Sequence, residues 1–158
     1  QTIESICKIV TKLNKKLIIK IHPSPDEFDP TELVQKINPN IKIVKSGKIS
    51  PLIKNSNFVI VIDFSTVILD AHLLKKPVIS ITVKNNGFGI PFDFRTNSSI
   101  STNVNELEEI ILKLDNKQYF DEIVKKGEKA SSKYLTKTSD YSKNLFDLVS
   151  NQIHNNDV

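Results

Sequence analysis

An α/β doubly wound parallel sheet is the fold that this sequence predicts, and three observations support it. Short apolar runs and helical patterns alternate at least four times along the chain, as expected for parallel strands joined by helical crossovers. The run over residues 58–62 has the length and β-branched content of a strand that is buried on both faces. Pro77 opens another apolar run, and the start of a strand is one of the few sheet positions that accept proline.

The first third of the chain predicts alternating helices and strands. Apolar residues recur at helical spacing over residues 3–13, and the apolar run that follows ends at His22. The next helical pattern has Asp29 or Thr31 as its cap, and a Ser-Gly pair turns the chain after a second apolar run. The expected elements are a helix over 3–13, a strand over 17–21, a helix over 30–37, a strand over 41–44 and a short helix over 49–55.

The rest of the chain continues this alternation and ends in helices. Residues 85–99 contain two of the four glycines and predict a long irregular loop, a feature that in a compact domain tends to be functional. The expected elements are a strand over 58–62, a helix over 65–75, a strand over 78–83, a short strand near 99–101, a helix over 105–114 and helical structure over 119–153.

Length and composition indicate a single domain. With 158 residues and 39% hydrophobic content, we expect one α/β domain over residues 1–154 and a frayed tail over 155–158. The net charge of +4 comes mainly from dispersed lysines, and Arg95 is the only arginine. Nucleic-acid readers depend heavily on arginine, so a nucleic-acid partner is disfavoured.

Cysteine usage and hydropathy bear on the compartment. Cys7 is the single cysteine, which excludes an intramolecular disulfide and fits a reducing, cytoplasmic environment. It lies on the apolar face of the first helical pattern, so we predict a core residue rather than a nucleophile. No apolar run approaches the length of a membrane span, and no signal peptide is visible. The absence of methionine suggests a piece of a longer polypeptide.

Three polar features are expected at one edge of the sheet, because an open parallel sheet binds ligands at the carboxyl ends of its strands. His22 and Pro23 follow one predicted strand, and the sequence Asp-Phe-Ser-Thr over residues 63–66 follows another. The loop that contains Gly87 and Arg95 follows a third strand, and we include these two residues as candidate ligand contacts. The convergence of all three features is more persuasive than any one of them.

The strand-to-helix turn over residues 63–66 is the strongest candidate for phosphate binding. Ser65 and Thr66 offer hydroxyls and backbone N–H groups at a predicted helix N-terminus, where phosphates bind well. The structural alternative is that one hydroxyl only caps the helix. Asp70 lies one helical turn beyond Thr66, where its carboxylate can accept both hydroxyls of a ribose. An exposed Asp70 paired with a nearby lysine is equally compatible with the pattern.

Other candidate residues also have structural alternatives. Asp63 can position a ligand group or form an Asx turn. His22 can contact a phosphate or a leaving group, or be a plain loop residue. His72 lies inside the amphipathic helical pattern and is expected to be structural. The histidines are too scattered for a metal site, and no Gly-rich phosphate motif is present, so we expect no metal, no resident cofactor and no NAD or ATP chemistry.

Several short motifs, in order, resemble the C-terminal half of GT-B-type sugar-nucleotide enzymes. The nearest patterns are those of CDP-glycerol glycerophosphotransferases and related capsule or surface-polysaccharide transferases, which carry a Lys-x-His-Pro strand end and an Asp-Tyr-Ser-Ser turn. UDP-N-acetylglucosamine 2-epimerases share the layout, but their Gly-Gly turn is absent here. Phe64 replaces the usual tyrosine. The matching segments are residues 20–23, 49–53, 55–59, 63–70 and 76–79.

The resemblance implies a function and a set of roles. Ser65 and Thr66 would contact the nucleotide phosphates, Asp70 the ribose, and His22, as catalytic residue, the phosphate or the transferred group. The chain would be the domain that binds a nucleoside diphosphate-linked sugar or alditol donor for surface polysaccharide synthesis. It would be inactive without a missing N-terminal domain of the same chain that holds the acceptor. The full-length enzyme would be cytoplasmic, with peripheral association at the inner face of the membrane open.

Two other functions stay open at this stage. The chain can be a non-catalytic α/β binding or interaction module that keeps the sheet without the activity. It can also be a UDP-sugar 2-epimerase-like enzyme, which would form product without an acceptor. Binding of UDP, CDP or GDP distinguishes the first alternative from a donor-binding domain.

Overall fold

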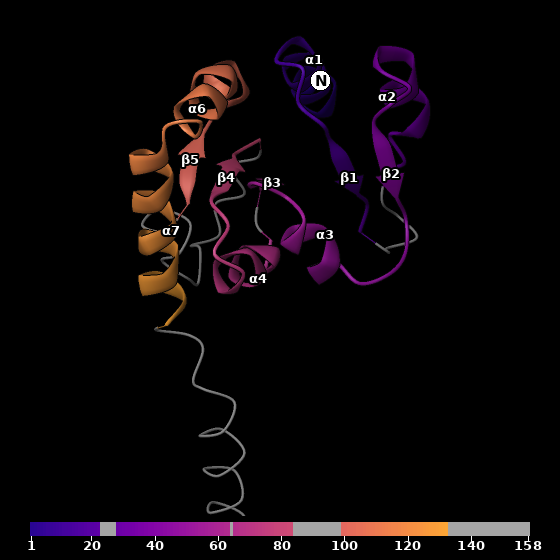
Figure 1. Ribbon diagram of the computed structural model, residues 1–158. Helices are drawn as coiled ribbons and strands as arrows, with labels where there is room; N and C mark the ends of the chain where they lie inside the picture. Colours follow the sequence, from indigo (N-terminus) through magenta and orange to yellow (C-terminus); the bar gives the residue numbers. More distant parts are fainter. Residues whose placement is uncertain (23–27, 64, 84–98, 133–158) are drawn as a thin grey trace, which may run out of the picture.

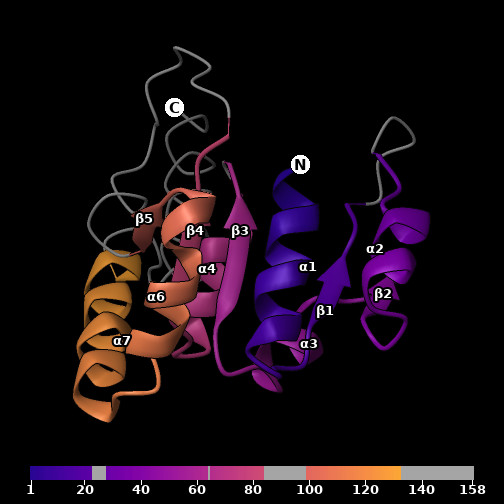
Figure 2. The same cartoon turned by 90° about the horizontal axis from the view of Figure 1, so that it is seen from above.

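The computed structural model describes residues 1–22, 28–63, 65–83 and 99–132. The strands within these ranges are all parallel and fall into two hydrogen-bonded sheets, β1-β2 and β3-β4-β5. The α/β class and the parallel sheet are therefore confirmed. The expectation of one continuous sheet is not met within the described residues, because β1 (Ile18–Lys20) and β3 (Val59–Ile62) lie next to each other without pairing (Figures 1 and 2).

Helices cover both faces of the strands (Figure 1). On one face lie α1 (Thr2–Lys12), α2 (Thr31–Ile37) and α6 (Leu107–Lys113), and on the other lie α3 (Ser50–Lys54) and α4 (Val67–Leu73). The remaining described elements are β2 (Lys42–Val44), β4 (Val78–Ile81), β5 (Ile100–Thr102), a 3₁₀ turn η1 (Val104–Glu106) and α7 (Lys117–Ser131).

Within the described residues, the core consists of three apolar clusters that follow from this layering. Helix α1 joins two of them, because Ile6 and Val10 pack with β4 and α6 while Cys7 packs with Val34 of α2 and with Ile41. The third cluster lies between α3, α4 and strands β3 and β4. Cys7 is fully buried, as its place on the apolar helix face predicts. Strand β4 is buried along its whole length, which explains why three of its four residues, Val78, Ile79 and Ile81, are apolar.

The element boundaries mostly agree with the sequence pattern, with instructive differences. Helix α4 is shorter than predicted: it begins at Val67 and ends at Leu73, before Lys75, whose positive φ of 56° stops the helix. The pattern expected over 105–114 divides into η1 and α6, because the Asn103 side chain accepts from the Asn105 amide and tightens the first turn. Of the helical structure expected over 119–153, α7 extends to Ser131, and the expectations for residues 133–158 lie outside the described residues.

Candidate functional site

The carboxyl ends of the parallel strands form the candidate site. The arrowheads of β1 and β3 point to the same side in Figure 2. His22 follows β1, while Asp63 and Ser65 follow β3. From β1 the chain crosses to β2 in one direction, and from β3 it crosses to β4 in the other (Figure 1). Such a reversal is a topological switch point, where open α/β sheets bind their ligands.

Asp63 positions the turn after β3. Its backbone has a positive φ of 56°, a left-handed conformation that aspartate tolerates better than most residues. Its Oδ1 accepts a hydrogen bond of 2.8 Å from the Val83 amide, just beyond the end of β4. The side chain therefore ties the ends of two neighbouring strands together. This bond between strand ends is neither the ligand contact nor the Asx turn that the sequence predicts for Asp63.

The two hydroxyls before α4 have different surroundings. Ser65 is half-buried, and its Oγ accepts a hydrogen bond of 3.3 Å from the Val67 amide at the start of the helix. A serine hydroxyl that accepts one bond keeps its proton free to donate. Thr66 is exposed and makes no side-chain capping bond. Ser65 thus has the capping role, and the Thr66 hydroxyl has no partner among the described residues. Phe64 lies outside those residues.

Asp70 lies in the first turn of α4 and is half-buried. The ion pairs and hydrogen bonds of the described residues do not include its carboxylate. The pairing with a lysine that we considered as an alternative is therefore not found in the described part of the chain. An acidic side chain near a helix N-terminus is favoured by the helix dipole, so its position has a structural benefit even without a ribose.

The strand end before His22 is held by a lysine. The Lys20 Nζ donates to the carbonyl oxygen of Ile21 at 2.8 Å and to that of Lys45 at 3.4 Å. It thereby joins the chain after β1 to the chain after β2. His22 itself is exposed at this edge, consistent with a contact residue and equally with a loop residue.

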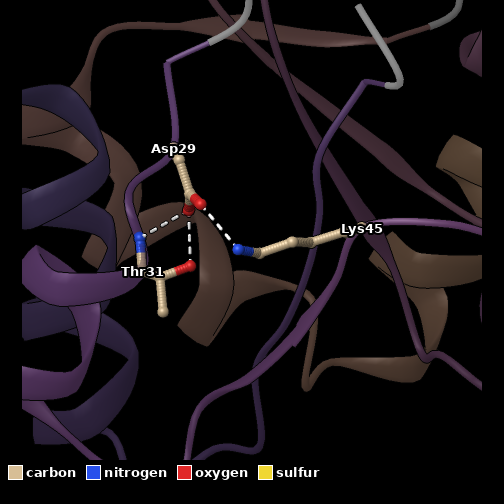
Figure 3. Close-up of polar contacts among 3 residues, drawn as sticks. All are labelled: Asp29, Thr31 and Lys45. Carbon is tan, nitrogen blue, oxygen red and sulfur yellow. Dashed lines mark hydrogen bonds and ion pairs between the residues drawn. The ribbon is translucent and has the colours of Figure 1, made fainter. Parts of the chain in front are cut away.

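A polar cluster of Asp29, Thr31 and Lys45 lies at the same edge of β1 and β2 (Figure 3). The sequence predicts only part of it. The Asp29 Oδ1 accepts bonds from the amide and the hydroxyl of Thr31, and Lys45 Nζ lies 2.6 Å from Asp29 Oδ2. These bonds, that of Lys45 first, lower the pKa of the Asp29 carboxyl to about 2. Asp29 was predicted as a cap of this helix. Lys45 was not, because nothing in the sequence links it to a residue 16 positions earlier.

Thr102 and Glu106 were also missed. Thr102 ends β5, is nearly buried, and donates from Oγ1 to Glu106 Oε2 at 2.7 Å. The sequence signal for the Thr102–Glu106 contact was the four-residue spacing between a strand end and the first turn of the following helix. Within the described ranges, no group of three His, Cys, Asp or Glu side chains is placed to hold a metal ion. The candidate contacts Gly87 and Arg95 lie outside these ranges.

His72 belongs to the core, as expected. It is only 2% exposed and lies against α7, where an added Cβ on Gly127 would come within 2.4 Å of His72 Nδ1. Burial lowers the pKa of this imidazole to about 4, because a low-dielectric environment disfavours the charged form. The imidazole is therefore neutral at physiological pH, and its role is in core packing rather than in the candidate site.

Comparisons with known proteins support the fold rather than a family. No sequence family and no curated protein sequence matches the chain. A chain of the solved "Crystal structure of GtfA/B complex" is similar in structure, with a TM-score of 0.60 at 12% sequence identity. The match covers 85% of this chain and 30% of that chain, so the described domain spans less than a third of that protein. None of the helices in the described ranges combines the length and apolar character needed to cross a bilayer. The chain has a Rossmann-like α/β fold, and this fold is what it shares with the similar chain.

Proposed function

We propose that this chain is the nucleotide-binding domain of a two-domain glycosyltransferase-like enzyme. Its donor is a nucleoside diphosphate-linked sugar or alditol, and its role is in surface polysaccharide synthesis. The observation that supports the proposal is that polar residues follow the carboxyl ends of β1 and β3, on either side of the reversal in strand order. The acceptor site belongs to a second domain, in keeping with a similar chain of which this domain covers 30%.

Each proposed contact uses a group that the fold leaves available. The Thr66 hydroxyl and the proton of the Ser65 hydroxyl donate to the diphosphate oxygens at the start of α4. The Asp70 carboxylate, one turn further along, accepts from the ribose hydroxyls. His22, exposed after β1, contacts the phosphate or the transferred group. Asp63 keeps this turn in place through its bond to Val83.

A second candidate is a non-catalytic binding module, favoured by a specific observation. Asp63 and Ser65 already have structural duties, the first at the end of β4 and the second at the start of α4. A turn that only closes the sheet and caps a helix needs no ligand. Nucleotide binding separates the two functions.

The experiment is a titration of the 158-residue chain with UDP, CDP and GDP, followed by thermal melting. A nucleotide at about 100 times its dissociation constant adds about 2.7 kcal/mol, which raises the melting temperature by about 5–10 °C. Replacing Ser65 by alanine together with Thr66 by valine weakens binding about 10- to 100-fold through the lost charge-assisted bonds. Asp70→Asn weakens nucleotides but leaves inorganic pyrophosphate unaffected.

Two matched controls test whether these losses are local to the site. Asn116→Ala removes the side chain that caps α7, which accepts from the Tyr119 amide at 3.0 Å, and destabilises the fold by about 1 kcal/mol. Asp121→Asn removes an exposed carboxylate from α7. Both controls are expected to bind nucleotides normally. Unchanged affinity in all the site variants, or no nucleotide binding at all, would refute the donor-binding function.

A further inference from the structure

The amino ends of the strands define an edge of the fold opposite the candidate site. Because the described strands are all parallel, the turns that lead into them share one edge, on the side away from the arrowheads in Figure 2. Helix α6 also ends there, before the turn into α7. We call this edge the amino edge, and it consists of residues 13–17, 36–42, 52–58, 73–77 and 112–118.

Short contacts join each of these turns to a neighbour. They are those of the Lys42 amide with the Leu17 carbonyl oxygen at 3.3 Å, of Lys15 Nζ with Asp115 Oδ1 at 2.8 Å, and of the Val59 amide with the Pro77 carbonyl oxygen at 2.9 Å. Neighbouring turns therefore lie side by side along the amino edge.

The amino edge has a large excess of positive charge. Its turns contain nine lysines and one aspartate, a net charge of +8, whereas the whole chain has a net charge of +4. The remainder of the chain is therefore negative overall. Seven of the nine lysines are exposed and two are half-buried. They are Lys15, Lys16, Lys36, Lys42, Lys54, Lys75, Lys76, Lys113 and Lys117.

Ion pairs neutralise only three of these lysines in the described part of the chain. The pairs are Lys15 with Asp115, Lys75 with Glu128, and Lys113 with Glu109. No carboxylate of a described residue forms an ion pair with the other six. Like charges gathered at one edge repel one another, which disfavours the folded chain.

Helix dipoles account for few of the unpaired lysines. Lys36 and Lys54 lie in the last turns of α2 and α3, where the dipole favours a cation. Lys117 begins α7, where the dipole disfavours a cation. Lys16 and Lys42 lie outside the helices. Fold stability therefore gives no reason for so many cations at one edge, whereas an anionic partner does.

Two exposed leucines lie among the lysines. Leu73 and Leu112 are 57% and 51% exposed, in the last turns of α4 and α6. Surfaces that bind at the boundary between lipid headgroups and acyl chains combine lysines with exposed apolar side chains. A nucleic acid fits less well, because the amino edge contains no arginine.

We propose that the amino edge is a docking surface for an anionic lipid membrane. The lysines lie among the phosphates of the headgroups, to which a point charge on a flexible stem binds without a fixed geometry. Leu73 and Leu112 reach the boundary of the acyl chains. Docking in this orientation leaves the carboxyl ends of the strands, and with them the candidate site, facing the solution. The proposal rests on the charge and exposure of the amino edge and is independent of the proposed function.

The test is sedimentation of the 158-residue chain with lipid vesicles. Vesicles of equal parts phosphatidylcholine and phosphatidylglycerol are expected to bind the protein, and vesicles of phosphatidylcholine alone are not. Each lysine at an anionic bilayer contributes about fivefold in affinity, so Lys16→Gln, Lys42→Gln and Lys54→Gln together should weaken binding about 100-fold.

Two further variants make the test specific. The matched control replaces Lys8, Lys48 and Lys125, three exposed lysines outside the amino edge, by glutamine. It has the same net charge as the amino-edge variant and is expected to bind nearly as well as the unaltered chain. Leu73→Ser with Leu112→Ser should weaken vesicle binding about 10-fold and leave binding to polyglutamate unchanged, because only a membrane offers an apolar layer.

Four results would overturn the proposal. Equal binding to both kinds of vesicle, or to neither, is the first. The second is a control variant that loses as much affinity as the amino-edge variant, since net charge alone would then decide binding. The third is a leucine variant that binds vesicles as tightly as the unaltered chain. The fourth is tighter binding to polyglutamate than to the anionic vesicles, which would assign the amino edge to an acidic protein.

Discussion

Helix α7 packs on α4 through a contact that leaves no space for a side chain at Gly127. An ideal Cβ at this position would lie 2.4 Å from Nδ1 and 2.9 Å from Cε1 of His72. The imidazole is only 2% exposed, so it cannot turn out into solvent without opening the interface. We predict that Gly127→Ala destabilises the protein, although alanine is the better helix former.

The expected size follows from two opposing effects. Overpacking a closely packed core costs about 1–3 kcal/mol. Replacing glycine by alanine inside a helix gains about 1 kcal/mol. The free energy of unfolding should therefore fall by up to about 2 kcal/mol, which lowers the melting temperature by up to about 4–8 °C in a domain of this size.

A double-mutant cycle in urea separates the two effects. In a His72→Ala background the clash is gone, so Gly127→Ala should stabilise the protein by about 1 kcal/mol through helix propensity alone. The sign of the effect thus reverses between backgrounds. If Gly127→Ala stabilises both backgrounds equally, α7 does not pack closely against His72 at Gly127.

Three further predictions concern titration and the strand ends. Burial holds the pKa of His72 at about 4, below its usual 6.5. The stability that the neutral imidazole contributes is therefore complete above pH 6.5 and is lost as the pH falls toward 4, so the free energy of unfolding should drop by about 2 kcal/mol between pH 7 and 5. A His72→Gln variant whose stability falls equally with pH would exclude this cause. Lys45 is the first cause of the lowered pKa of Asp29, about 2. This pKa should therefore rise in Lys45→Gln, as measured by NMR titration, and an unchanged pKa would show that the ion pair does not form. Asp63→Ala should destabilise more than Asp63→Asn, because asparagine keeps both an acceptor for Val83 and tolerance of a positive φ; equal losses in chemical denaturation would contradict this role.

The sequence by itself determined the α/β class and the position of nearly every described element. These depend on local patterns: the apolar run that becomes β3, the helical spacing of α1 and the proline before β4. The burial of Cys7 and His72 was also predictable, because both lie on the apolar faces of amphipathic helices.

Only the tertiary structure decided which residues meet. The bond from Val83 to Asp63, the ion pair of Lys45 with Asp29 and the packing of Gly127 on His72 join positions that are between 16 and 55 residues apart. No local pattern encodes such pairs, since they depend on strand order and on the faces that the helices cover. The same holds for the pairing of the described strands, because the sequence predicts strands, whereas hydrogen-bond partners are set by how those strands are arranged in space.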